Sequence, residues 1–273
     1  MAAPRFRPGL KRVDYSLACS PPTYDFLTVL AAAARDTAPD VGLIVNIMDG
    51  KRNWAERDTV IAPACKAWRQ KQLFPGLCEL VPAVEQVVFD ILPALGQSIE
   101  YVTHPYVFSP VFRAPNYAVA SLPKLEPYIT FTVRQSWFQA ARDTHGPTWD
   151  AVIKALPLPV VVVPDTEATM ARQECSVSAG SQYVPAAFSP ALRMALYEGA
   201  VLNLFTTGGP MMLAPHSNIK AECFGLHVEG VKSCKPDTLT RLGLTDGRVV
   251  GSTRFHWGVD RDMALAAVKE RLT

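Results

Sequence analysis

The sequence predicts an α/β fold with mostly parallel sheets, organised in two similar halves. The apolar runs at residues 41–48 and 159–163 are nearly continuous, which is typical of strands buried on both faces of a parallel sheet. Segments with helical periodicity separate the predicted strands, as in right-handed β-α-β units. A proline-rich stretch at residues 104–126 interrupts this alternation, which then restarts. We therefore expect two Rossmann-like domains, one on each side of that stretch.

The interruption also sets the expected boundaries. With 273 residues, 49% of them hydrophobic, the chain is long enough for two units that each bury a core. We expect an N-terminal Rossmann-like domain at residues 1–110, a linker at 111–126 and a C-terminal Rossmann-like domain at 127–273. The linker contains too many prolines for a regular element and is a natural wall for a cleft between the domains.

The first half is expected to follow the order β-α-β-α-β. Its predicted strands are 13–18, 41–48 and 98–103, and its predicted helices are 22–35 and 53–74. Pro63 is expected to kink or split the second helix. The second half is expected to have strands at 128–133, 159–163, 174–178, 200–205 and 219–224, and helices at 147–156, 190–198 and 260–272.

The turn after the strand at 200–205 is the feature on which the functional prediction depends. It consists of Thr206, Thr207, Gly208, Gly209 and Pro210, and we call it the 206–210 turn. The apolar segment that follows is expected to be helical. A strand, a glycine turn and a helix opened by proline present bare backbone N–H groups at a helix N-terminus, where phosphate binds. Plain connecting-turn chemistry, in which the threonines only satisfy the turn, is the alternative.

Other polar residues follow strands of the same half. Arg134 ends the strand at 128–133, Arg142, Asp143 and Thr144 precede the next helix, and Asp165, Thr166 and Glu167 end the strand at 159–163. Because the carboxyl ends of parallel strands meet at one edge, we expect these loops to open beside the 206–210 turn.

Two arginines beside a Gly-Gly turn are suited to clamping a diphosphate, since guanidinium binds phosphate oxygens in bidentate fashion. The alternative for Arg134 and Arg142 is an ordinary surface ion pair. For Asp165 the two interpretations are contact with a ribose or sugar hydroxyl, and the capping of a turn or helix.

Two carboxylates in the first half are candidates for a general base. Asp25 lies at the start of the first helix, in the sequence Thr23-Tyr24-Asp25, and Asp49 ends the second strand. Either carboxylate could deprotonate an acceptor hydroxyl. The alternative is a first-turn charge that complements a helix dipole.

The composition excludes several classes. A net charge of +2 gives no support for a nucleic-acid partner. The six cysteines include no CxxC pair and the histidines no HxxxH pair, so we expect reduced thiols, no metal site and a cytoplasmic protein. There is no GxSxG elbow, Walker P-loop or GxGxxG fingerprint, which argues against a serine hydrolase, a P-loop kinase and a standard NAD enzyme.

No apolar run approaches the ~18–20 residues of a membrane span. Basic residues gather at 51–71, where a solvated helix face is one interpretation and a peripheral contact with the inner face of a membrane is the other. They are Lys51, Arg52, Arg57, Lys66, Arg69 and Lys71.

The second half resembles glycosyltransferase-like proteins of bacterial surface-polysaccharide loci. The resemblance is carried by the strand ending in Arg134, by Arg142-Asp143-Thr144, by Trp149 and by the strand ending in Asp165-Thr166-Glu167. The segment from Leu204 to Ala214 resembles the Gly-Pro turn of heptosyltransferase-like and fucosyltransferase-like enzymes with the GT-B fold. Residues 255–260 are similar to the aromatic-Trp-x-x-Asp ending of such proteins, and residues 23–26 match more loosely. The chain departs from the pattern at Gln135, Asp143 and Thr144.

The resemblance implies two Rossmann-like domains that face a central cleft, with a nucleotide-sugar donor in the C-terminal domain and no obligatory metal or cofactor. Arg134, Arg142 and the 206–210 turn would stabilise the leaving diphosphate, and Asp25 or Asp49 would deprotonate the acceptor. The implied reaction moves a hexose, heptose or fucose to a glycan or lipid-linked acceptor in polysaccharide biosynthesis. On this basis we expect Arg134→Ala to lower transfer at least ~10²-fold with folding intact.

Two alternatives remain beside this prediction. A GT-B-like binding or scaffold protein would keep the fold and lack transfer, because fold does not fix function. A sugar-nucleotide epimerase is disfavoured, since Cys19-Ser20-Pro21-Pro22 stands where the glycine fingerprint of the first βα turn is expected.

Overall fold

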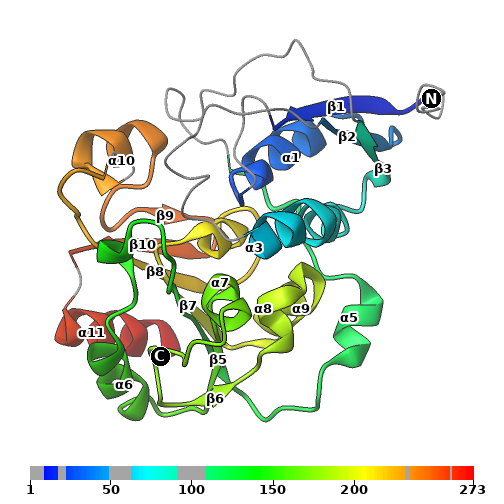
Figure 1. The fold of residues 1–273 in the computed structure, drawn as a ribbon. Coiled ribbons are helices and arrows are strands. Elements are labelled where there is room, and N and C mark those ends of the chain that lie inside the picture. Colours follow the sequence, from blue (N-terminus) through cyan, green and yellow to red (C-terminus); the bar gives the residue numbers. More distant parts are fainter. Residues whose placement is uncertain (1–8, 18–22, 49–62, 91–107, 232–233, 259) are drawn as a thin grey trace.

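The computed structural model describes residues 9–17, 23–48, 63–90, 108–231, 234–258 and 260–273. Two sheets organise these residues, a small one in the N-terminal half and a larger one in the C-terminal half (Figure 1). All strand pairs but one are parallel, so the predicted α/β class with mostly parallel sheets is confirmed.

The small sheet has the strand order β1-β2-β3, with β1 at Lys11–Ser16, β2 at Leu43–Met48 and β3 at Val84–Asp90. The first two are the predicted strands at 13–18 and 41–48, shifted by two residues or fewer at their ends. The third was not predicted, because its sequence VEQVVFD alternates polar with apolar residues only at its start. The predicted strand at 98–103 lies outside the described residues. Helix α1 (Phe26–Arg35) buries Phe26, Leu27, Leu30 and Ala31.

The second predicted helix of this half is a rod of three segments, namely α3 (Pro63–Trp68), the π-helix η1 (Arg69–Leu73) and α4 (Phe74–Cys78). Pro63 is the first described residue of α3, so the predicted kink or split at this proline stays a prediction. The irregular part is η1, directly before Pro75, whose missing N–H cannot support a regular α-helical turn. Residues 53–62 of the predicted helix lie outside the described part.

The large sheet has the order β6-β5-β4-β7-β8-β10-β9. Its strands are β4 (Ile129–Thr132), β5 (Val160–Val163), β6 (Ser181–Gln182), β7 (Leu202–Thr206), β8 (Ala221–Gly225), β9 (Val249–Val250) and β10 (Thr253–Trp257). Apart from the antiparallel β9, the spatial order in chain rank is 3-2-1-4-5-6, which is that of the Rossmann fold. The Rossmann-like prediction for this half is therefore confirmed.

Helices cover both faces of the large sheet (Figure 1). On one face α6 (Gly146–Lys154) and α11 (Arg261–Leu272) pack on Phe131, Leu204 and Phe224. On the other lie α7 (Thr166–Met170), α8 (Pro185–Phe188) and α9 (Pro190–Gly199). The remaining helix of the second half, α10 (Pro236–Leu242), precedes β9.

The predicted strand at 174–178 is wrong. Side chains take the backbone groups that a neighbouring strand would otherwise pair with. Asp150 accepts from the N–H groups of Ser178 and Ala179, each at 2.8 Å. Gln135 accepts from Ser176 N–H at 3.0 Å and donates to the carbonyl of Glu174 at 3.1 Å. This segment is therefore a loop fastened to α6 and to the end of β4.

The predicted linker contains a helix, α5 (Asn116–Ser121), contrary to the expectation that no regular element forms there. Pro115 stands directly before its first residue, where proline is tolerated. The three N–H groups before it bind both halves, because Phe112 donates to His216 O, Arg113 to Leu80 O and Ala114 to the Glu198 carboxylate. The segment fastens the two halves together.

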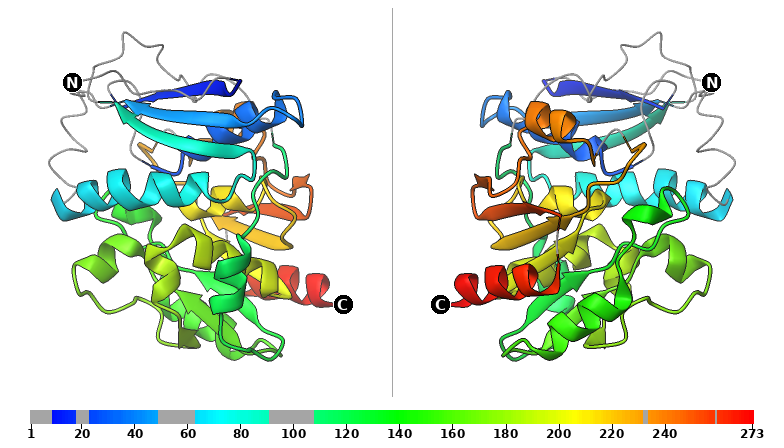
Figure 2. Two further views of the ribbon diagram at one scale, coloured as in Figure 1. Left: turned by 90° about the vertical axis from the view of Figure 1, so that its right-hand side faces the viewer. Right: turned by 90° about the vertical axis from the view of Figure 1, so that its left-hand side faces the viewer.

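One apolar cluster runs through both halves. It joins Tyr15, Phe26 and Phe74 of the first half with Tyr197 and Phe205 of the second. Figure 2 shows the rod of α3, η1 and α4 between the small sheet and the second half. The ring of Trp68 meets that of Phe188 edge-on, with centroids 6.5 Å apart. The relative position of the halves is thus fixed by side-chain packing.

Among the described residues, no helix combines the length and the apolar composition that crossing a bilayer requires. Most of the basic segment 51–71 lies outside the described part. Among the described residues of this segment, Lys71 is exposed, whereas Arg69 turns inward and forms an ion pair with Glu167. Arg69 therefore does not belong to a solvated or membrane-facing surface, and peripheral membrane contact stays a prediction.

His216 gives the fold a testable dependence on pH. Its side chain is fully buried between Phe108 and Phe112, and burial lowers its pKa to about 4. The folded state therefore holds neutral imidazole, and between pH 6.5 and 4 the unfolded chain binds more protons than the folded one. We expect the free energy of unfolding to fall as the pH drops through this window, by about 3 kcal/mol in total.

Urea unfolding at a series of pH values measures this effect. His216→Phe keeps the aromatic contacts and should flatten the pH dependence of stability between pH 6.5 and 4. The control His145→Asn changes an exposed histidine and should leave this pH dependence in place. An equal pH slope in wild type and His216→Phe would contradict the assignment.

Candidate functional site

The strand order of the large sheet reverses between β4 and β7. The chain moves from β4 outward to β5 and β6, and then returns to β7 on the other side of β4. In open α/β sheets ligands bind in the crevice that forms at such a switch point, beyond the carboxyl ends of the strands. Arg134 follows β4 and the 206–210 turn follows β7, so both predicted elements flank this crevice.

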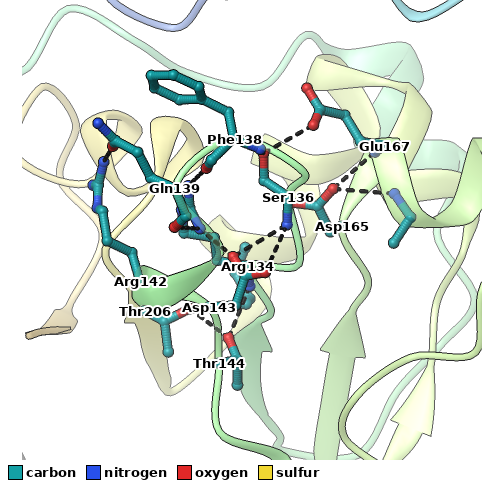
Figure 3. A network of polar contacts seen from close by, with 12 residues as sticks. Arg134, Ser136, Phe138, Gln139, Arg142, Asp143, Thr144, Asp165, Glu167 and Thr206 are labelled. Atoms are coloured by element: carbon teal, nitrogen blue, oxygen red, sulfur yellow. Dashed lines mark hydrogen bonds and ion pairs between the residues drawn. The ribbon is translucent and has the colours of Figure 1, made fainter. Parts of the chain in front are cut away.

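The structure brings four of the predicted residues together there (Figure 3). Thr144 accepts from the Arg134 N–H at 2.9 Å, and its hydroxyl lies 2.8 Å from that of Thr206. A Cβ placed on Gly208 would lie 3.6 Å from Arg134 Cδ, so the arginine side chain runs along the turn. Residues 62 and 74 positions apart in the chain thus form one continuous surface.

The guanidinium of Arg134 is bound by its own loop. It forms an ion pair with Asp143 and donates to the carbonyls of Phe138, at 2.5 Å, and Gln139, at 3.2 Å. Gln139 is left-handed, with φ 58°, a strained geometry for a residue with a side chain. Arg134 therefore holds the 135–143 loop in place, a role that could not be predicted from the sequence.

Arg142 lies close to Arg134. It ends the 3-10 helix η2 (Ala140–Arg142) and donates to the side chain of Gln139 at 2.9 Å. Burial lowers the pKa of Arg134, and the positive charge of Arg142 lowers it further. The two predicted arginines thus converge at the switch point, and the ion pair of Arg134 with Asp143 is largely buried and not an ordinary surface pair.

The segment after the 206–210 turn differs from the prediction. It is η3 (Gly209–Leu213), a 3-10 helix of five residues, because Pro210 and Met211 lead straight into a buried apolar segment. A helix this short offers no macrodipole, so the predicted helix part of the anion site is absent, and anion binding by the turn itself stays a prediction. What the turn does offer are the N–H groups of Gly208 and Gly209, which have no acceptor among the described residues.

Several other predicted site residues have structural partners. Asp165 caps α7 by accepting from the N–H groups of Glu167, at 2.8 Å, and Ala168, at 3.3 Å. Thr166 donates to the carbonyl of Ala187 at 2.6 Å. Thr207 donates its N–H to Phe224 O and continues the pairing of β7 with β8. For these three residues the capping and turn interpretations describe the contacts seen.

Glu167 has a role that the sequence did not reveal. Its carboxylate pairs with Arg69 of η1 and accepts from the Ser136 hydroxyl at 2.9 Å. It therefore connects the rod of the first half to the 135–143 loop. In the sequence, the only indication that Glu167 belongs to the site was its position directly after Asp165 and Thr166.

The first half reaches the turn through residues 23–25. Asp25 stands before α1 without capping it, and accepts from the Thr23 hydroxyl at 2.6 Å. The neighbouring Tyr24 packs on Gly209, where an added Cβ would lie 2.6 Å from the ring carbon Cδ2. Asp25 is thus next to a residue in contact with the turn. Asp49, the other base candidate, lies outside the described residues.

A cavity of 260 Å³ opens at the carboxyl ends of β5 and β6. Gln135, Asp165, Cys175 and Gln182 are among the residues that line it. Burial, and then the charge of Glu167, raise the pKa of Asp165. The lining offers amides, a carboxylate and apolar atoms, which suit the uncharged polar part of a ligand better than its phosphates.

No protein-family model matches this sequence, and no curated protein sequence matches it. Two solved structures are similar in fold. One is described as the glycosyl transferase family 9 from Veillonella parvula DSM 2008, with a TM-score of 0.53, 9% identity, and coverage of 96% of each chain. The other is described as the ADP-heptose LPS heptosyltransferase II of E. coli, with a TM-score of 0.49, 11% identity, and coverage of 96% of this chain and 97% of that one.

At 9% identity the likeness to the Veillonella protein shows the fold alone. Since it covers both halves, it agrees with the predicted α/β fold of the GT-B kind, while the predicted domain boundaries and the cleft between the domains stay predictions. The resemblance seen in the sequence and the likeness seen in the structure thus agree on the fold.

Proposed function

We propose that the chain is a glycosyltransferase that moves a sugar from a nucleoside-diphosphate donor to a glycan or lipid-linked acceptor without a metal ion. The second half would hold the donor and the first half the acceptor. The observation that carries the proposal is the meeting of Arg134 with Gly208 at the switch point, with Tyr24 against Gly209 from the other half. The groups that could bind a diphosphate thus come from the second half, and the carboxylate that could act as a base comes from the first half, on the other side of the contact between them.

The diphosphate would lie on the 206–210 turn. The N–H groups of Gly208 and Gly209 supply donors there, and Arg134 and Arg142 supply positive charge. The nucleoside or sugar would extend toward the 260 Å³ cavity, where Asp165 and the amides bind hydroxyl groups. Fixed donors and charges of this kind stabilise a leaving diphosphate as its negative charge develops.

Asp25 would act as the general base. It takes the proton of an acceptor hydroxyl, whose oxygen then forms a bond to the anomeric carbon of the sugar. The bond from that carbon to the diphosphate oxygen breaks, and the diphosphate leaves with the bonding electron pair. Hexosyl, heptosyl and fucosyl transfer are the reactions that the sequence resemblance suggests, in cytoplasmic polysaccharide biosynthesis.

Calorimetry with UDP, GDP, ADP, CDP and dTDP tests the donor half of the proposal. We expect at least one diphosphate to bind, and the matching nucleoside to bind at least ~10-fold more weakly, because charge-assisted bonds contribute about 1.5–3 kcal/mol. Equal binding of nucleoside and diphosphate would rule out the diphosphate site. Transfer from the matching nucleotide sugars then tests the reaction.

A binding or scaffold protein with this fold is the second candidate. It is favoured by one observation, namely that the Arg134 guanidinium is engaged by Asp143 and by two carbonyls of its own loop. A scaffold of this kind would bind none of the five diphosphates. The same calorimetric experiment therefore separates the two candidates.

A further inference from the structure

Arg193 of α9 is a buried cation that forms no ion pair with any carboxylate of the described residues. Its side chain is 1% exposed, and no carboxylate lies within 4 Å of it among the described residues. Its guanidinium donates to the carbonyls of Ala186, at 2.8 Å, and Ala187, at 3.2 Å, and to the Tyr24 hydroxyl at 3.0 Å. Burying an arginine is costly, and an apolar side chain would fill this place at lower cost. The arginine therefore has a task other than packing.

That task is visible in what Arg193 holds. Tyr24 comes from the first half, 169 positions away, and its ring also lies beneath the guanidinium, 5.9 Å from ring centre to Cζ. Arg193 binds the hydroxyl end of Tyr24, while Cβ, Cγ and Cδ2 at the other end of the side chain contact Gly209 and leave no room for a Cβ there. The ring is thus held between a charged donor and the bare backbone of the 206–210 turn.

The next two residues tie this contact to the first half. Asp25 follows Tyr24, and adjacent Cα atoms are ~3.8 Å apart. Phe26 follows Asp25 and is fully buried, with its ring centre 4.8 Å from that of Tyr15 and 5.0 Å from that of Phe74. Asp25 therefore stands between one side chain anchored in the second half and another anchored in the first.

We propose that Tyr24 and Arg193 are positioning residues that set the place of Asp25 relative to the 206–210 turn. Through them the base from one half is aligned with the donor site of the other. The inference rests on the proposed function, and adds to it the contact that aligns the base with the donor site. Because a displacement of about 1 Å can lower turnover ~10²-fold, loss of this contact should affect the chemical step more than binding.

Tyr24→Phe tests the proposal with the smallest change. It keeps the ring against Gly209 and removes only the hydroxyl that Arg193 binds. We expect kcat to fall at least ~10-fold, while the KM for the donor and the Kd for the nucleoside diphosphate stay within ~2-fold of wild type. Arg193→Lys, which keeps the charge and one donor, should retain more activity than Arg193→Met.

Tyr128→Phe is the matched control. Tyr128 is also a buried tyrosine whose hydroxyl bonds to α9, at the carbonyl of Leu196, but it precedes β4 at the amino edge of the sheet. It should lose a similar amount of stability and no turnover. Tyr24→Phe with a kcat within twofold of wild type, or with kcat and diphosphate affinity lost in parallel, overturns the proposal.

Hydrogen–deuterium exchange supplies a readout that does not need transfer. In Tyr24→Phe, exchange should rise at residues 23–30 and 206–213 together and stay unchanged elsewhere, whereas Tyr128→Phe should change neither segment. Unchanged exchange in both segments of Tyr24→Phe would also overturn the proposal that Tyr24 and Arg193 join the two halves. If wild type neither binds a diphosphate nor transfers a sugar, the proposed function fails and Asp25 is no base, while exchange still decides whether Tyr24 and Arg193 join the halves.

Discussion

Arg134→Ala is expected to lower the free energy of unfolding by about 3 kcal/mol and transfer by at least ~10²-fold. The first effect is a revision, since the sequence alone led us to expect intact folding. Arg134 is 8% exposed, and removing it leaves Asp143 half-buried without its cation and two carbonyls without a donor. The 135–143 loop would lose the side chain around which it is built.

Urea unfolding and steady-state kinetics measure the two effects. Arg134→Lys keeps the charge but loses the planar fork, so it should recover only part of the stability. Arg134→Ala combined with Asp143→Ala should be more stable than Arg134→Ala alone, because no unpaired carboxylate remains. If Arg134→Ala unfolds like wild type, the guanidinium is not engaged by its loop in solution. Arg134 would then be free to bind the diphosphate without any structural role.

Glu222→Ala is expected to lower the free energy of unfolding by about 4 kcal/mol, the largest effect of any single change considered for stability. Glu222 is fully buried on β8 beneath α11, and two arginine cations and the imidazole of His256 converge on it. Arg254 Nε lies 3.0 Å and His256 Nε2 2.5 Å from its Oε2, and Arg271 Nε lies 2.7 Å from its Oε1. Without the carboxylate these cations would repel one another under the last helix.

The matched control is Glu270→Gln, which removes another carboxylate that pairs with Arg254. Glu270 is 68% exposed, so water replaces its contact and the urea midpoint should not move. Since Glu222 lies away from the switch point, diphosphate binding by the folded Glu222→Ala variant should match wild type. A stability loss equal to that of Glu270→Gln would show that the buried cluster contributes nothing beyond a surface pair.

The sequence predicted the fold well where a single force dominates. The apolar runs that became β2, β5 and β7 bury nearly every residue, so burial alone identifies them as parallel strands. The segment 174–178 was wrongly predicted to be a strand because Asp150 and Gln135, distant in the chain, satisfy its backbone. Strand β3 was missed because the polar pair Glu85-Gln86 interrupts its apolar residues. Helix α5 was missed because the prolines around it flank the helix and do not interrupt it.

The site was predictable in its location and less so in its contacts. The rule that loops gather at the carboxyl edge of a parallel sheet correctly placed Arg134, Thr144, Thr206 and Gly208 side by side. The sequence could not show that Arg134 binds its own loop, since that depends on carbonyls turned inward by the left-handed Gln139. Nor could it show the role of Arg193, whose only signal is one basic residue in a mostly apolar helix.

The apolar cluster that runs through both halves has a consequence for how this protein could be divided or recombined. A fragment that ends near residue 110 or begins near residue 127 would expose Phe74 or Tyr197 to water, and we expect such a fragment to aggregate when produced alone. Chimaeras with a new acceptor half would need the rod, the residues around Tyr24 and the surface of α9 to be exchanged as a set. New specificity is thus easier to obtain by altering the loops where the two halves meet than by exchanging a whole half.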